Sequence, residues 1–412
     1  MDSKTKRLKF ACYTTNVSMS VVGNLSPVLF LTFRNLYGIS YSLLGLLVLI
    51  NFFTQLIVDL IFSFFSHKFN IPRAVKMTPV LTVAGLLIYA IYPFLFPQTA
   101  YLGLVIGTVI FSAGAGFGEV LISPVIAALP SKDPDREMSK LHSVYAWGVV
   151  FVILVATAFL LFFGGENWQY LALIFAIVPF VSAVVFFGSE IPEMETPGRV
   201  MGALAQLKKK QLWICVAAIF LGGAAECTMA QWSSGYLEQA LGIPKVWGDV
   251  LGVAMFAVML GIGRTMYSKI GKNIGRVLFF GAVGAAVCYF VAAVSPFAVV
   301  GLIACALTGF CTSMLWPGNL IVASDRFDGG GVFIYAMMAA GGDLGASVAP
   351  QLVGVITDTV IAGSKTAALA ESLSLSPEQL GMKLGMLFAM LFPLGAIFLY
   401  KHIWNGYRKS NK

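Results

Sequence analysis

The chain has 412 residues, of which 58% are hydrophobic and only 11% charged, and its mean hydropathy is +0.85. This composition excludes a soluble globular protein. The formal net charge of +8 is explained by basic loops at one membrane face that bind anionic lipid heads, so no nucleic-acid partner is expected.

The apolar residues form twelve blocks, each long enough to cross a hydrocarbon core of about 30 Å, which needs roughly 20 helical residues. The blocks are continuously apolar and lack the alternation of a barrel strand, so they predict helices. The fold class expected is therefore an all-α integral membrane protein with twelve transmembrane helices. The predicted spans are residues 10–33, 41–66, 74–96, 100–128, 139–163, 168–188, 211–237, 247–270, 277–295, 297–322, 332–357 and 384–404.

The loops predict the orientation, because Lys and Arg beside spans stay in the cytoplasm. With the N-terminus inside, the outer segments hold only four basic residues, Arg34, Lys245, Lys365 and Lys383, and most of the others lie in the inner segments. Both termini are therefore expected to be cytoplasmic. The first span lacks a cleavage site and is expected to be retained. All cysteines fall within spans, which predicts no disulfides. The sequons also lie inside the first span, which favours the plasma membrane of a bacterium, the inner membrane.

Residues 189–210 interrupt the spans with two prolines and the run Lys208–Lys210. They are predicted to form a cytoplasmic linker between two six-helix halves, residues 1–188 and 211–412. The halves resemble each other. Gly116-Phe117 and Pro124 of the fourth span match Gly309-Phe310 and Pro317 of the tenth at one constant offset. Duplicated halves with a site between them are typical of secondary transporters.

Several motifs carry a more specific resemblance. Ser63–Ile71 is a degenerate copy of the signature Gly-x-x-x-Asp-Arg-x-Gly-Arg, and Ser268–Arg276 keeps its closing Gly-Arg. The chain thereby resembles the major facilitator superfamily. The pattern Gly-x-Gly-x-x-Glu at Gly114–Glu119, with Leu141-His142 and Gly148, is similar to the fucose/galactose/glucose–proton symporter family. The resemblance implies two pseudo-symmetric six-helix halves, alternating access, and Glu119 as a proton site.

Charged side chains inside spans cost several kcal/mol to bury and mark pathways or pairs. Glu119 and Glu226 lie near the predicted midplane of spans four and seven, and are predicted to bind and release a coupling proton. Asp343 in span eleven is a third candidate, although its glycine-rich surroundings equally indicate close helix packing. The alternative for these carboxyls is a structural hydrogen bond or a basic partner.

Gating residues are predicted from the repeat. Asp59 and Arg264 occupy equivalent places in spans two and eight, so we expect them in cytoplasmic-side contacts that change during transport, or as separate lipid-shielded anchors. His142 opens span five and is either a proton relay to Glu119 or an ordinary interfacial histidine.

Substrate contacts are predicted from amides and indoles within the spans. Amide groups beside indole faces suit a neutral hydroxylated solute such as a sugar, although single tryptophans in membrane helices commonly pack or face lipid. The candidates are Asn16, Asn24, Gln55, Trp147, Gln231, Trp232, Trp316 and Asn319.

No phosphate-binding loop, paired cysteines or acidic-histidine motif occurs in the sequence, so we expect no catalytic residues, no metal and no cofactor beyond a coupling ion, a proton. The predicted function is proton-coupled symport of a small polar solute by a monomer surrounded by lipid. A proton-coupled antiporter exporting apolar drugs or metabolites is the alternative, and a receptor or scaffold would need a soluble module. Ser376–Gln379 predicts a short capped surface helix before span twelve.

Overall fold

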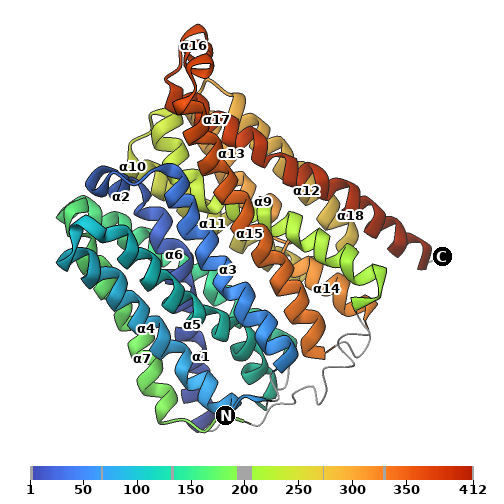
Figure 1. The fold of residues 1–412 in the computed structure, drawn as a ribbon. Coiled ribbons are helices and arrows are strands. Elements are labelled where there is room, and N and C mark those ends of the chain that lie inside the picture. Colours follow the sequence, from blue (N-terminus) through green and yellow to red (C-terminus); the bar gives the residue numbers. More distant parts are fainter. Residues whose placement is uncertain are drawn as a thin grey trace.

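The computed structural model in Figure 1 describes residues 3–65, 68–130, 134–192, 207–271, 273–327 and 331–410. Most of the predicted linker, residues 193–206, and the side chain of His142 lie outside this described part. Helices of the first half are α1 (Ser3–Val28), α2 (Phe30–Tyr37), α3 (Tyr41–Phe65), α4 (Ile71–Leu95), α5 (Ala100–Ala128), α6 (Pro134–Phe163) and α7 (Trp168–Phe187). Those of the second half are α9 (Lys210–Leu241), α10 (Lys245–Trp247), the π-helix η4 (Gly248–Ala254), α11 (Met255–Ile270), α12 (Ile274–Val294), α13 (Ala298–Thr312), α14 (Pro317–Arg326), α15 (Gly331–Ala362), α16 (Ser364–Ser372), α17 (Pro377–Ala389) and α18 (Leu391–Ser410).

The predicted all-α membrane fold is confirmed. Within the described residues, eleven spans are long and apolar enough to cross a membrane, and α1 with α2 forms a twelfth that bends by 46°. The bend follows Pro27 in the last turn of α1, because proline removes a backbone N–H and clashes with the preceding turn. The chain is therefore a multi-pass membrane protein.

The two ends of the bundle are packed differently. We call the end that carries the chain termini the terminal end, and the end with α2, α10 and α16 the distal end (Figure 1). Near the distal end one apolar cluster includes residues of both halves, such as Phe30 and Trp232, whose ring centroids lie 5.2 Å apart. At the terminal end each half has its own cluster, although Leu60 and Phe64 of α3 pack against the second half. The halves thus share a core near the distal end.

Helices α3 and α15 lie side by side across the boundary between the halves (Figure 1). Glycine permits this approach, because a Cβ on Gly354 of α15 would lie 2.5 Å from the carbonyl oxygen of Tyr41. A Cβ on Gly45 of α3 would likewise lie 3.2 Å from the Cα of Gln351. Small residues at these positions let the two backbones meet.

Span ten differs from its repeat partner. Pro124 lies inside the unbroken α5, whereas Pro317 begins α14 after a turn at residues 313–316 that separates it from α13. The span predicted over residues 297–322 is found at Ala298–Ala323, but a turn at residues 313–316 interrupts its helix. A proline alone removes one hydrogen bond, so the break in span ten needs the further side chains described below.

The last span begins earlier than predicted. The Ser376 side chain accepts a hydrogen bond from the Gln379 backbone, and the Gln379 side chain accepts one from the Ser376 backbone, both at 3.0 Å. This capping box starts α17, which together with α18 forms the last span. Leu380 and Met386 of α17 are buried in the bundle, so α17 is not a separate surface helix. The separate surface helix predicted there was wrong, and the short α16 is found instead.

We expect Gly345→Ala to destabilise the fold. Its Cβ would lie 2.0 Å from the carbonyl oxygen of Phe220 in α9, and overpacking of this kind costs about 1 to 3 kcal/mol. Thermal unfolding in detergent, followed by size-exclusion chromatography, would show a lower midpoint. Gly235→Ala is the matched control, because its Cβ would meet nothing within 4 Å. Equal midpoints for both variants would contradict this account of the packing.

Candidate coupling site between the halves

Three carboxyl groups, two buried and one half-buried, meet at the boundary between the halves. Asp59 of α3, Glu119 of α5 and Asp343 of α15 have carboxylate oxygens that all lie within 4.8 Å of one another. Asp59 and Asp343 are at most 1% exposed. Two of the groups belong to the first half and one to the second, so this carboxyl cluster joins both halves.

Close backbone packing brings the cluster together. A Cβ on Gly116 of α5 would lie 2.9 Å from Val58 of α3, so these two helices touch next to Asp59 and Glu119. On α15, Gly342 lies directly before Asp343 and receives the ring of Trp316. Residues with side chains at these two glycine positions would hold the carboxyl groups further apart.

Electrostatics restrict the charge of the cluster. At this separation each ionised pair repels by roughly 3 kcal/mol for an effective dielectric constant of about 20. Three ionised carboxylates are therefore unfavourable unless protons or a small cation neutralise them. The Oδ2 atom of Asp343 is buried and makes no hydrogen bond within the described residues. The arrangement can bind a proton or a monovalent cation.

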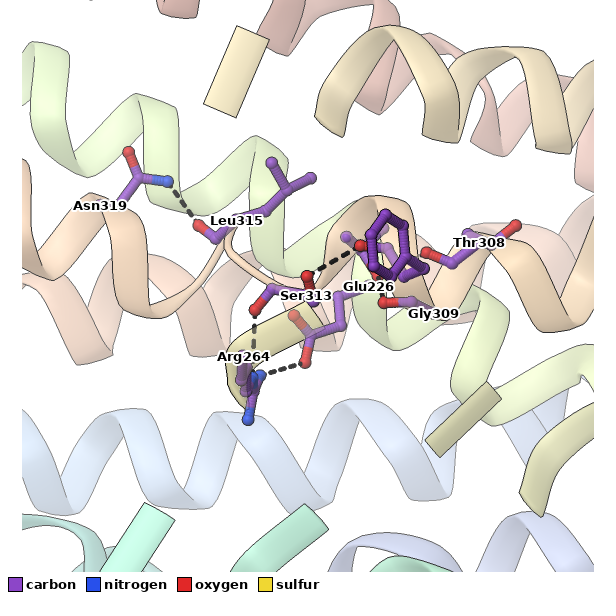
Figure 2. Close-up of polar contacts among 9 residues, drawn as sticks. Glu226, Arg264, Thr308, Gly309, Ser313, Leu315 and Asn319 are labelled. Carbon is purple, nitrogen blue, oxygen red and sulfur yellow. Dashed lines mark hydrogen bonds and ion pairs between the residues drawn. The ribbon is translucent and has the colours of Figure 1, made fainter. Parts of the chain in front are cut away.

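A second charged group lies in the second half. An Nη atom of Arg264 in α11 lies 2.9 Å from Oε1 of Glu226 in α9, and its Nε donates to the carbonyl of Ser313 at 3.1 Å (Figure 2). Glu226 is thus held by a basic partner, the alternative considered for the carboxyls. The structure places Asp59 and Arg264 in different clusters.

The amides predicted to face substrate mostly bind the protein itself. Four of them donate through their side-chain amide nitrogens to nearby oxygen atoms. The acceptors are the Leu141 carbonyl for Asn16 (2.6 Å), the Ser20 carbonyl for Asn24 (2.9 Å), the Asn51 side chain for Gln55 (3.3 Å) and the Leu315 carbonyl for Asn319 (2.5 Å). Gln231 of α9 differs, because its Nε2 donates across the boundary to the carbonyl of Gly23 at 3.0 Å. Its Oε1 is buried and makes no hydrogen bond within the part of the chain described.

The three predicted tryptophans lie in different surroundings. Trp232 of α9 is buried, and its Nε1 donates to the carbonyl of Pro350 in α15 at 2.9 Å. Trp316 packs on Gly342 of α15. Trp147 is 58% exposed and lines a small pocket between α6 and α11 together with Arg264. The structure therefore does not gather the three indoles into one binding pocket.

Cross-half contacts at the distal end were not predicted from the sequence. Asp358 of α15 accepts hydrogen bonds from the backbone N–H (2.6 Å) and hydroxyl (2.5 Å) of Ser42 in α3. Glu378 of α17 accepts from Tyr41 at 2.6 Å and pairs with Arg34 at 3.3 Å. We call these two carboxylates and their partners the distal lock. In the sequence, the only indication of these contacts was that the two acidic residues lie at the ends of spans.

A fold of paired six-helix halves with buried charges at the boundary defines a membrane transporter. The sequence pattern of the Major Facilitator Superfamily matches residues 11–350, and the chain belongs to this superfamily. The resemblance found in the sequence motifs is confirmed at this level.

Solved structures show the same fold at low sequence identity. A bacterial homologue of the human lysosomal transporter Spinster, in an inward-facing conformation, matches with a TM-score of 0.75 and 13% identity over 99% of this chain and 98% of that one. A D-xylose–proton symporter gives 0.71 and 16% over 95% and 97%. The E. coli fucose:proton symporter gives 0.61 and 13% over 96% and 99%. No protein of curated function matches the sequence significantly.

Proposed function

We propose that this transporter moves a small polar, sugar-like solute together with protons, by alternating access across the plasma membrane of a bacterium, with both termini in the cytoplasm. The observation that carries the proposal is the carboxyl cluster of Asp59, Glu119 and Asp343, which joins the two halves. Deprotonation of these carboxyl groups makes the two halves repel each other at the cluster, and protonation lets them approach. Proton binding is thereby linked to the relative position of the halves.

The class of solute is supported by three polar atoms on α9 and α15 that lack hydrogen bonds within the described residues. Glu226 Oε2, Gln231 Oε1 and Asp343 Oδ2 are buried and make no hydrogen bond among the described residues. Leaving such atoms unpaired costs about 1 to 3 kcal/mol each. A solute with several hydroxyl groups could donate to these acceptors, whereas an apolar drug could not. This favours the sugar-like solute over the drug-exporting antiporter.

The test is uptake into proteoliposomes of the purified monomer. D-xylose, L-fucose, D-glucose and D-galactose form one panel, and hydrophobic cations form another. Each is measured with and without a pH gradient that is acidic outside the vesicles. We expect accumulation of a sugar that requires the pH gradient. A sodium gradient that replaces the pH gradient would identify the cluster as a sodium site. Transport confined to the hydrophobic cations would reject sugar symport in favour of antiport.

A further inference from the structure

The break in span ten leaves one carbonyl without its helical partner. In a regular helix the carbonyl of Ser313 would accept from the N–H of residue 317, but Pro317 has none. Arg264 of α11 supplies the missing donor through Nε at 3.1 Å (Figure 2). A side chain from another helix thus replaces a backbone hydrogen bond.

A second carbonyl at the break is also satisfied by a side chain. The N–H of Asn319 donates to Trp316 at 3.2 Å and not to Leu315. The Asn319 side chain donates to the Leu315 carbonyl instead, at 2.5 Å (Figure 2). Since unpaired carbonyls are costly in a membrane, Arg264 and Asn319 together stabilise the broken form of this span.

Arg264 also ties the break to α9. One of its Nη atoms lies 2.9 Å from Glu226, while Nε serves Ser313. The planar guanidinium can hold both partners in a fixed relative geometry, which a lysine ammonium cannot. The position of the turn at residues 313–316 is thereby fixed against two neighbouring helices.

The break in turn contacts the residue that precedes Asp343 of the carboxyl cluster. Its last residue, Trp316, places ring atoms 2.5 to 2.8 Å from where a Cβ of Gly342 would lie. Asp343, a member of the cluster, is the next residue of α15. A continuous series of contacts therefore runs from Glu226 through Arg264, the break and Trp316 to the backbone next to Asp343.

We propose that Arg264 is a positioning residue for the coupling site: by replacing the hydrogen bond that Pro317 cannot make, it holds the break in span ten and so seats Trp316 against α15 beside Asp343. The inference deepens the proposed function, since only that function gives Asp343 its coupling role. The placement of Trp316 can be tested separately from coupling.

The first test is the fluorine NMR spectrum of protein labelled with 5-fluorotryptophan, in which the Trp316 signal is assigned by its loss in Trp316→Phe. We expect Arg264→Gln to shift or broaden this signal. Adding Pro317→Ala restores an N–H for Ser313, so the double variant should return the signal towards that of Pro317→Ala alone. This measurement needs neither substrate nor an ion gradient.

The second test is sugar exchange at equal pH on both sides of the membrane. Arg264→Gln should slow exchange about tenfold, the effect of losing one charged hydrogen bond, and Pro317→Ala should restore most of it. Pro124→Ala, the repeat-related proline in unbroken α5, is the control that should not restore it. If Arg264→Gln does not fold, Arg264→Lys is used with the same expectation.

The outcomes are distinct. Recovery with Pro317→Ala in both measurements supports the positioning role. Failure of Pro317→Ala to restore the Trp316 signal in Arg264→Gln overturns the positioning role. This conclusion holds even if Glu226→Gln, which removes the charge that Arg264→Gln leaves unpaired, restores transport. If the Trp316 signal recovers but sugar accumulation does not depend on the pH gradient, proton coupling is rejected while the positioning role of Arg264 stands.

Discussion

Glu119→Gln is expected to abolish sugar accumulation driven by a pH gradient while leaving sugar exchange at equal pH intact. Glutamine matches the size of the side chain but cannot exchange a proton, so the carboxyl cluster loses one of its three titrating groups. Accumulation should fall at least about tenfold, since uphill transport depends on the bound proton. The measurement is paired proteoliposome uptake and counterflow for the same sugar.

The control for this variant is Glu166→Gln, which changes an exposed carboxyl group in the distal loop after α6. It should accumulate sugar as the unchanged protein does. Uptake of protons on sugar binding in detergent, followed with an indicator dye, provides a second measurement without a gradient. Accumulation that survives Glu119→Gln would count against the cluster as the coupling site.

Asp358→Ala is expected to open the distal end. The substitution removes the acceptor of both hydrogen bonds from Ser42, and hydrogen bonds to charged groups contribute about 1.5 to 3 kcal/mol each. Loss of about 1.4 kcal/mol already changes the ratio of two states tenfold, so the open population should rise by at least about that factor. Asp358→Asn retains one acceptor and should have a smaller effect.

Distances between spin labels at Gln98 and Lys365, exposed residues at the distal end of the two halves, report this opening in a protein without its native cysteines. The long-distance population should grow in Asp358→Ala. Glu371→Gln, an exposed change on α16, should leave the distribution unchanged. An unaltered distribution in Asp358→Ala would mean that the distal lock does not hold the halves together.

The sequence was sufficient for the fold because the membrane simplifies the problem. Long apolar blocks can satisfy their backbone in lipid only as helices, and the repeated glycine and proline positions revealed the two halves. The break in span ten could not be predicted, because Pro124 and Pro317 occupy equivalent places. The difference depends on Arg264 and Asn319, one of which comes from another helix.

The candidate site was predicted as a set of residues but not as groups. Buried charges are rare in spans, so Asp59, Glu119 and Asp343 could each be identified. Their grouping could not, because it depends on how α3, α5 and α15 pack. The repeat suggested related roles for Asp59 and Arg264, but packing placed Arg264 beside Glu226 instead.

The apolar cluster shared by both halves near the distal end gives the conformational change a characteristic response to temperature. Opening this end exposes surface such as Phe30 and Trp232 to water, and burial of apolar surface becomes less favourable on cooling. The equilibrium between closed and open forms should therefore carry a heat-capacity change. Plots of its logarithm against inverse temperature will curve, with the open form gaining population in the cold.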